Sequence, residues 1–430
     1  MIVGSVSEQF LMVNQVVRIV KIVKVVRVVN SSKAVVYNDG MARTKNPFSP
    51  GTGTTPPYLA GRVDELTDFR YALLDGPGSH ERLSLVSGMR GVGKTVLLNE
   101  FEDIAHAESW WVISETATPG FMERIRDKIY SLAKDQFDLV SRKLTGLNIA
   151  SLGGIQLSEA EKFTPTVTLR DVLTDFLELQ AERDEKLNQP PVGVLITLDE
   201  LHYYHQSEII EFGATIQHLV RENREIALAM AGIPHSIKPL LANDRGRNPV
   251  TFLRRANRID LGLISDDDVA IALAEPLKNT EISWDDDALA EAVSICGGYP
   301  FMIQLIGQQA FRKKEGRTIS IAAVRTGGET ARRKLGQLVH DTALSDLSPV
   351  DRTFLAAMAV DNGPSRMADI AQRLKADAQY VGKYRGRLLE AGVIVRTAHG
   401  YVDFQLPYMR DYLRKHVVVD SLAVTDLFNE

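Results

Sequence analysis

Cysteine is almost absent from this 430-residue chain, which contains Cys296 alone. One cysteine excludes an intrachain disulfide and any metal site built from several thiolates, so nothing requires an oxidising compartment and we expect a cytoplasmic protein. A strong excess of one charge is also missing, because 50 Lys and Arg stand against 55 Asp and Glu, a net charge of −5. So small a net charge excludes a generally basic protein that coats nucleic acid.

A long uninterrupted apolar run is missing too. Residues 16–30 (VVRIVKIVKVVRVVN) are rich in valine, but a charge stands at every third position: Arg18, Lys21, Lys24 and Arg27. These charges argue against a membrane-spanning segment and against a secretory signal. On a helix they would be spread too widely around its circumference to form an amphipathic face that binds a membrane surface. We therefore expect no membrane partner. We interpret residues 1–40 as upstream sequence translated in error, with Met41 as the working start. An intact mass of the native protein that includes them would contradict this interpretation.

The remaining chain is long enough for two to four domains. Residues 46–57 are rich in Pro, Gly, Ser and Thr, which predicts an extended lead-in rather than a packed element. A helix is expected over residues 61–74, with Leu66, Phe69, Leu73 and Leu74 at helical spacing, and a strand over residues 82–87 (RLSLVS).

Residues 88–95 read GMRGVGKT and fit the pattern G-x-x-x-x-G-K-[ST], between that strand and a predicted helix. Glycines allow the backbone N–H groups to turn inward around a phosphate, and the helix N-terminus adds its positive dipole end. Lys94 would neutralise the β- and γ-phosphates, and Thr95 would bind Mg²⁺. The predicted phosphate-binding residues are Gly88, Met89, Arg90, Gly91, Val92, Gly93, Lys94, Thr95 and Val96.

A second motif follows about 100 residues later, where residues 192–200 read VGVLITLDE. The apolar run predicts a parallel strand buried on both faces, preceded by a helix over residues 168–187, and residues 146–155 are a candidate hairpin. Asp199 at the strand end would hold Mg²⁺ through water, and Glu200 would orient or deprotonate the attacking water. Two adjacent carboxylates favour an ATPase over a GTPase or a small-molecule kinase.

Four segments together resemble AAA+ ATPases of the origin-recognition and archaeal signalling-ATPase type: GRVDEL at 61–66, GMRGVGKT, LITLDE and GGYP at 297–300. The resemblance covers roughly residues 56–414. It implies an α/β P-loop core, a helical lid that closes over ATP and Mg²⁺, and a C-terminal winged helix. It also implies adenine contacts at Tyr58, Leu59, Gly61 and Arg62, and nucleotide contacts from the lid at Tyr299 and Pro300.

Two positions depart from the family pattern. The strand at residues 226–231 (IALAMA) ends in Ala231-Gly232, where relatives place a polar residue that senses the γ-phosphate. His235 is a candidate substitute, or else a histidine in a solvated turn. The lid has Gly298-Tyr299-Pro300 where many relatives carry an arginine, so we expect slow hydrolysis suited to a switch.

An arginine from a neighbouring subunit would complete such a site, because a guanidinium stabilises charge on the transferring phosphate. Arg254 and Arg255 are the candidates, and this role would require a homo-oligomer. A surface salt bridge is the alternative role for either side chain.

The C-terminal part predicts three short helices followed by a hairpin. Ser348 with Asp351 forms a capping box with Pro349 at the first helical position, Ser365 is expected to open a second helix, and a third covers residues 378–391. Strands at residues 393–396 and 401–405 complete a pattern that resembles a winged helix-turn-helix. Its third helix carries the candidate DNA contacts Lys383, Arg385 and Arg387.

The charge of this part leaves its partner open. From residue 345 to 415 there are 11 Lys and Arg and 8 Asp and Glu, a net of +3. That is modest for phosphate binding, so double-stranded DNA and a protein partner both remain candidates. The expected divisions are residues 1–40, a nucleotide-binding domain 41–262, a lid 263–343, a winged helix 344–417 and a tail 418–430. The expected function is that of an ATP-hydrolysing switch, or of a low-turnover ATP-regulated transcription or signalling factor.

Overall fold

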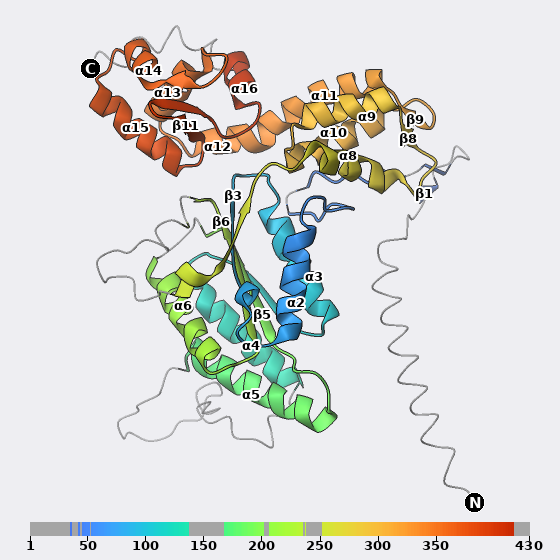
Figure 1. Ribbon diagram of the computed structural model, residues 1–430, viewed down its shortest axis with the longest axis vertical. Helices are drawn as coiled ribbons and strands as arrows, with labels where there is room; N and C mark the ends of the chain where they lie inside the picture. The colour runs from blue at the N-terminus through green and yellow to red at the C-terminus, as the bar shows by residue number, and fades with distance from the viewer. Residues whose placement is uncertain are drawn as a thin grey trace, which may run out of the picture.

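The computed structural model describes residues 45–51, 53–136, 167–201, 206–234, 237 and 252–416, together with two short paired strands, β1 (Val35–Val36) and β2 (Ala42–Arg43). Apart from β1, the predictions for residues 1–40 lie outside this description. So do those for His235, the hairpin at residues 146–155 and the tail 418–430. Figure 1 shows an α/β core with a helical lid and a C-terminal module side by side above it.

A five-stranded parallel sheet forms the centre of the core, in the order β4-β5-β6-β3-β7. The strands are β3 (Leu83–Gly88), β4 (Trp111–Thr116), β5 (Val194–Asp199), β6 (Ile226–Gly232) and β7 (Asn257–Leu261). Every residue of β6 is buried, as are the first five of β5, because helices cover both faces of the sheet. Since all five strands are parallel, their carboxyl ends meet at one edge.

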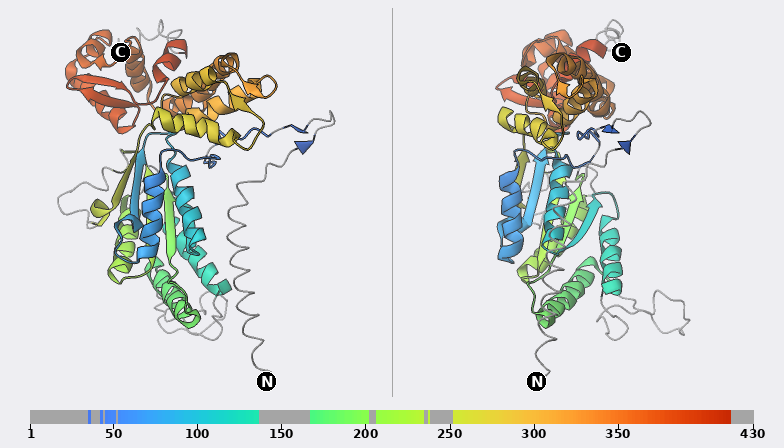
Figure 2. Two further views of the ribbon diagram at one scale, coloured as in Figure 1. Left: turned by 45° about the vertical axis from the view of Figure 1, so that its right-hand side comes forward. Right: turned by 90° about the vertical axis from the view of Figure 1, so that its right-hand side faces the viewer.

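Alternation along β5 decides which helices pack on which face. Leu195 belongs to the buried cluster with residues of α2 and α3, whereas Val194, Ile196 and Leu198 belong to the cluster with α4, α5 and α6. Figure 2 shows the sheet between these helices. The helices are α2 (Val63–Asp75), α3 (Lys94–Ala107), α4 (Phe121–Gln136), α5 (Leu169–Leu187) and α6 (Gln206–Arg221). Leu74, predicted with the inward-facing residues of α2, is 56% exposed.

The lid packs four helices around a small parallel strand pair. Its elements are α8 (Asp266–Ala274), β8 (Ser283–Trp284), α9 (Asp286–Cys296), α10 (Pro300–Lys313), β9 (Thr318–Ile319) and α11 (Ile321–Leu335). Cys296 is buried here as a small apolar residue, and burial raises the pKa of its thiol. A π-helical turn, η5 (Gly336–His340), and α12 (Asp341–Ser345) lead from the lid to the C-terminal module.

The C-terminal module contains helices and a small antiparallel sheet in the order β10-β12-β11. Its elements are α13 (Pro349–Ala359), β10 (Ser365–Arg366), α14 (Met367–Arg373), α15 (Ala378–Glu390), β11 (Ile394–Ala398), β12 (Tyr401–Phe404) and α16 (Met409–His416). The capping box of Ser348 and Asp351 is present. The prediction that Ser365 opens a helix was wrong: its backbone pairs with Val402 in the sheet, and its hydroxyl donates to the Met358 carbonyl oxygen at 3.2 Å.

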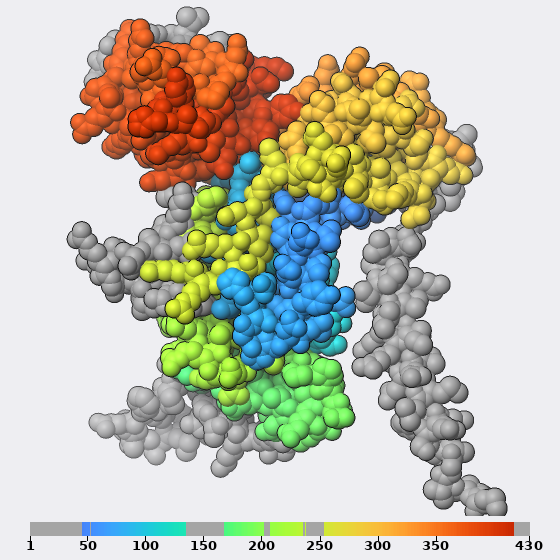
Figure 3. Space-filling model, viewed as in Figure 1, coloured from blue at the N-terminus to red at the C-terminus, as the bar shows by residue number. Residues whose placement is uncertain are grey.

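Lid and C-terminal module together cover the carboxyl edge of the sheet. Figure 3 shows both resting on the upper end of the core. Residues from all three parts, including Phe101, Leu335 and Phe354, belong to one buried apolar cluster. Among the described helices, none is long and apolar enough to cross a membrane.

Candidate nucleotide-binding site

The loop between β3 and α3 has the geometry of a phosphate cradle. It leaves the sheet at Gly88 and enters α3 at Lys94, and Gly91 and Gly93 adopt left-handed conformations with φ of 77° and 95°. Side chains other than glycine rarely adopt such angles. The loop thereby brings the free N–H groups of the α3 N-terminus to the carboxyl edge of the sheet, where they can bind an anion.

Lys94 lies in this loop as a largely desolvated cation. Its Nζ donates to the carbonyl oxygens of Gly88 and Met89, both at 2.9 Å. Burial lowers the pKa of Lys94 to about 8, although the nearby carboxylates of Asp199 and Glu200 act in the opposite direction. An anion that displaced the two carbonyl groups would stabilise the ammonium, so the loop is prepared for a phosphate.

Thr95 and Asp199 meet at the edge of the sheet. The Thr95 hydroxyl donates to Asp199 Oδ2 at 2.6 Å, although 104 residues separate the two in sequence. A hydroxyl and a carboxylate provide the hard oxygen ligands that Mg²⁺ prefers, with room left for water. The donor set therefore fits the predicted magnesium site.

Glu200 follows Asp199 in a left-handed conformation, with φ of 62°. Its backbone N–H donates to Asp199 Oδ1 at 2.7 Å. A non-glycine residue at positive φ is held there at an energetic cost, and such strain concentrates at functional sites. Both carboxylates line the same cavity as the loop.

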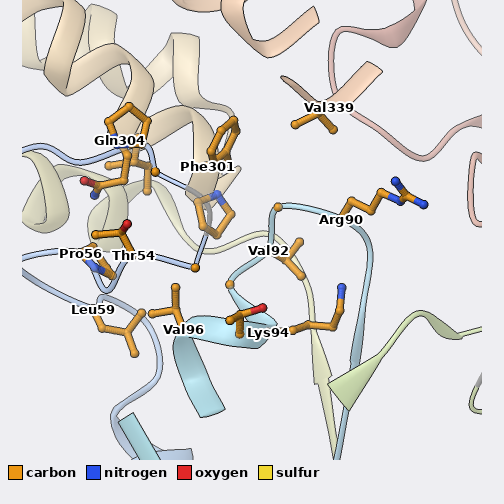
Figure 4. Close-up of a pocket in the computed structure, with 18 of the residues that line it drawn as sticks. Thr54, Pro56, Leu59, Arg90, Val92, Lys94, Val96, Phe301, Gln304 and Val339 are labelled. Carbon is orange, nitrogen blue, oxygen red and sulfur yellow. The ribbon is translucent and has the colours of Figure 1, made fainter. Parts of the chain in front are cut away.

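That cavity has a volume of about 520 Å³ and lies between core, lid and lead-in (Figure 4). Most of the predicted binding residues line it, namely Arg90, Gly91, Val92, Gly93, Lys94, Thr95, Val96, Tyr58, Leu59, Arg62 and Pro300. Gly88, Met89, Gly61 and Tyr299 do not. Its size suits a ligand as large as a nucleotide.

Tyr299 lies behind the phosphate loop rather than in the cavity. It is fully buried, and its hydroxyl donates to the Arg90 carbonyl oxygen at 2.7 Å. A Cβ added at Gly91 would stand 2.1 Å from that hydroxyl, so the tyrosine needs glycine in the loop. Desolvation raises the pKa of the Tyr299 phenol, which keeps it a neutral donor. The lid thus positions the loop through its backbone.

Arg62 connects the cavity wall to the start of the lid. Its guanidinium donates to the carbonyl oxygens of Gly61 at 3.0 Å and Gly262 at 3.1 Å. Burial lowers its pKa, against the attraction of Glu65 and Asp268. Gly61 lies outside the cavity in a left-handed conformation, with φ of 66°, and its carbonyl oxygen accepts one of these two hydrogen bonds.

The end of β6, where the sequence resemblance places a polar residue that senses the γ-phosphate, is apolar. β6 ends at Ala231 and Gly232, and the cavity continues from Gly232 to Ile233. The described residues at this strand end therefore offer neither a hydroxyl nor an amide side chain.

Arg254 and Arg255 lie at the end of the sheet where the parallel strands begin, opposite to their carboxyl ends. They form the short turn η3 (Phe252–Arg255) just before β7, whose first residue pairs with Ser84 while its last pairs with Gly88 beside the phosphate loop. At ~3.3 Å per residue, Arg255 is on the order of 20 Å below the loop. Neither arginine lines the cavity of its own chain.

One wall of the cavity was not predicted from the sequence. Ser49, Pro50, Gly51, Gly53 and Thr54 of the lead-in line it, together with Phe301 and Gln304 of α10. Phe48 is only 2% exposed. The lead-in is extended, as predicted, but it packs against the lid and the core. The sequence feature that could have indicated this packing is Phe48, a single large aromatic residue among Pro, Gly, Ser and Thr.

The three candidate DNA contacts on α15 do not form one surface. Residues 383 and 387 are four apart and share a helix face, whereas residue 385 is rotated by about 160° from 383. Lys383 is exposed, but Arg387 pairs with the buried Asp351 at 2.8 Å. Arg385 has a buried Nε that finds no hydrogen-bond partner among the described residues. Arg385 therefore does not share a helix face with the other two, and its role as a DNA contact stays a prediction.

The parallel sheet, the phosphate loop and the facing carboxylates define a P-loop nucleoside triphosphatase fold. Residues 58–225 match the family described as an AAA ATPase domain, so this part of the chain is an AAA+ P-loop ATPase domain. Residues 337–413 match a domain of unknown function.

Several known proteins are similar along most of the chain. A Walker-type ATPase of Pyrococcus abyssi superposes with a TM-score of 0.55 at 18% identity, over 83% of this chain and 96% of that one, and shows the same fold. Cdc6p of Pyrobaculum aerophilum gives a TM-score of 0.43 at 14% identity, over 88% and 98% of the two chains. An uncharacterized HTH-type transcriptional regulator of Methanocaldococcus jannaschii is 22% identical, over 83% of this chain and 88% of that protein.

Proposed function

We propose that the protein binds ATP with Mg²⁺, hydrolyses it slowly, and uses the bound nucleotide to control a C-terminal winged helix that engages DNA. The observation that carries the nucleotide part is the convergence of Lys94, Thr95 and Asp199 at one end of a cavity of about 520 Å³. A desolvated lysine beside a hydroxyl–carboxylate pair at a helix N-terminus suits a phosphate chain with its metal.

Each residue has a definite task in this proposal. Lys94 exchanges the carbonyl oxygens of Gly88 and Met89 for phosphate oxygens, and Tyr58, Leu59 and Arg62 surround the base. When bound, Mg²⁺ neutralises phosphate charge, with Thr95 as ligand and Asp199 holding its water. Glu200 orients the attacking water and accepts its proton as the bond to the γ-phosphorus forms and the bond to the bridging oxygen breaks.

Slow turnover follows from what surrounds the γ-phosphate end. Gly232 and Ile233 from the core and Pro300 and Phe301 from the lid face this cavity. None of these four can donate a side-chain hydrogen bond to the transferring phosphoryl group, and each such donor is worth several kcal/mol in a low-dielectric site.

Contacts of the phosphate loop support nucleotide control of the C-terminal module. The Arg90 guanidinium pairs with Asp346 at 3.0 Å, just after α12, while the Arg90 carbonyl oxygen accepts from Tyr299 of the lid. Met89 and Gly392, at the base of the hairpin, line the same small pocket. A nucleotide that shifts this loop therefore acts on the lid and the C-terminal module together.

The arrangement of the C-terminal module supports the winged helix. Three helices precede a hairpin that joins β10 in a three-stranded sheet, and α15 presents Lys383 on an open face. One relative is described as an HTH-type transcriptional regulator. A mobility shift of double-stranded DNA at low salt, with and without ATP, tests this assignment. A Lys383→Ala variant should weaken the shift, and no shift in either condition would reject DNA as the partner.

Protein docking is the second candidate, favoured by the arginine contacts. Arg387 is engaged by Asp351, so few cations are left on α15 for phosphates. The absence of a DNA shift together with a nucleotide-dependent protein complex would establish this role.

Two substitutions test the nucleotide part. Lys94→Ala should abolish ATP binding measured by calorimetry, whereas Glu200→Gln should retain binding and lower the hydrolysis rate by about 10²-fold or more. Asp103→Ala, at an exposed position of α3, is the matched control and should match the wild type. ATP binding by Lys94→Ala at wild-type affinity would contradict the proposed site. Function that survives in Glu200→Gln would show that the bound state alone is needed.

A further inference from the structure

Part of the lead-in, residues 46–51 and 53–55, forms a segment that we name the strap. It contacts α10 of the lid at one end and α3 of the core at the other, and its residues 49–51, 53 and 54 line the cavity between. In Figure 4, Thr54 of the strap is drawn between Gln304 of the lid and Val96 of α3. The strap therefore connects the lid and the core, and a bound nucleotide would lie between these two parts.

Polar contacts and one aromatic ring fix the lid end of the strap. The Asn46 side chain donates to the Gln308 carbonyl oxygen at 3.0 Å and accepts from the Phe48 N–H at 3.1 Å. The Ser49 N–H donates to Gln304 Oε1 at 3.1 Å. The Phe48 ring lies directly on Gly307, where an added Cβ would stand 2.4 Å from the ring. Glycine inside a helix destabilises it, so its presence in α10 suits this close approach.

Asn99 fixes the core end. Its amide nitrogen donates to the Gly53 carbonyl oxygen at 3.0 Å and to the Thr55 hydroxyl at 3.3 Å. Asn99 is one helical turn after Thr95 and shares its face of α3. A Cβ at Gly53 would lie 3.5 Å from the Thr95 methyl carbon, so this end of the strap reaches the predicted metal ligand.

We propose that Asn99 and Phe48 are positioning residues for nucleotide retention: they hold the strap as a wall of the cavity, so that the strap contacts bound nucleotide and slows its dissociation. This inference rests on the proposed ATP site. The strap touches the lid on one side and the neighbourhood of the phosphate loop on the other, so releasing either anchor opens the same wall. Because the strap residues that line the cavity can contact nucleotide only once it is bound, loss of either anchor should affect dissociation more than association.

The test uses the full chain and a fluorescent ATP analogue with Mg²⁺, displaced by excess ATP in a stopped-flow instrument. Asn99→Ala and Phe48→Ala should each raise the dissociation rate constant about tenfold or more while the association rate constant stays within twofold of wild type. Asp103→Ala on α3 is the control for the core anchor. Thermal unfolding without nucleotide, measured in parallel, separates loss of retention from loss of folding.

A double substitution makes the test specific for the lid anchor. Gly307→Ala should displace Phe48 and raise the dissociation rate, but in a Phe48→Ala background it should add nothing, because the space is then free. Gly382→Ala, in α15, is the matched control, since a Cβ there meets no atom within 4 Å.

Each outcome decides between the two proposals. Dissociation rates of Asn99→Ala and Phe48→Ala within twofold of wild type, with binding still lost in Lys94→Ala, would overturn the strap but leave the ATP site intact. Effects of Phe48→Ala and Gly307→Ala that simply add would overturn the ring–glycine anchor. Failure of the wild type to bind nucleotide would overturn the ATP site and the strap with it.

Discussion

Lys94 carries the most environment-sensitive charge of the site. An ammonium that is mostly buried and bonded to two carbonyl oxygens has lost hydration that these dipoles only partly replace. Its pKa of about 8 lies well below the ordinary value for lysine, 10.5. The side chain therefore changes its protonation state within a range that is accessible to binding measurements.

ATP affinity should depend on pH because of this lysine. Phosphate binds the protonated form, so affinity should be highest below pH 8 and fall about tenfold from pH 7 to pH 9, as Lys94 of the free protein loses its proton. Calorimetric titrations across this range measure the effect. In Lys94→Arg the charge persists, and its profile should be flat whatever its absolute affinity. A flat profile for the wild type would contradict the assigned pKa.

The same shift affects stability without nucleotide. The folded pKa is lower than the unfolded one, so between pH 8 and 10.5 the unfolded chain binds more protons than the folded chain. The contribution of Lys94 to the free energy of unfolding is therefore unfavourable below pH 8 and becomes less so as pH rises through that window.

At the scale of elements, the phosphate loop depends on the lid for its shape. The loop is joined to α10 by the Tyr299 hydroxyl on Arg90 and by the Phe301 N–H, which donates to the Gly91 carbonyl oxygen at 3.2 Å. These contacts fix the loop from behind while its front remains open to the cavity.

Tyr299→Phe should destabilise the protein by about 1–3 kcal/mol, because the Arg90 carbonyl oxygen would lose its donor in a buried place. Urea unfolding of both proteins measures this difference. Tyr71→Phe, at a tyrosine that is 59% exposed on α2, should change stability by less than about 0.5 kcal/mol. Equal effects of the two substitutions would show that the hydroxyl contact does not stabilise the loop.

At the scale of the whole molecule, two candidate cations for phosphoryl transfer lie far from the phosphate loop of their own chain. Arg254 and Arg255 lie at the edge of the sheet away from the phosphate loop. The distance from Arg255 to the phosphate loop of its own chain is on the order of 20 Å, which is too long for a side-chain rearrangement to close. Both arginines remain candidates only for the site of a neighbouring copy.

If Arg255 acts in this way, the ATPase rate per subunit should rise with protein concentration. Arg255→Ala should then abolish that rise and lower the rate at high concentration by about 10³-fold. Arg258→Ala, at an exposed position on the adjacent strand, is the control. A rate per subunit that is independent of concentration would reject the intersubunit role.

Much of this molecule follows from local sequence. Consecutive residues make up the phosphate loop, the buried strand ending in Asp199-Glu200 and the capping box at Ser348, and each has a residue pattern that favours one backbone conformation. For this reason the α/β core and most of the residues that line its cavity are predictable without coordinates.

Only the tertiary structure decided the rest, because those contacts join residues far apart in the chain. The Tyr299 hydroxyl hydrogen-bonds the back of the phosphate loop, and Arg387 pairs with the buried Asp351. The lead-in was predicted to be extended, and its sequence has no periodic apolar pattern that would indicate burial. Its role as a wall of the cavity depends on Gly307 and Asn99, which are brought to it by elements folded elsewhere.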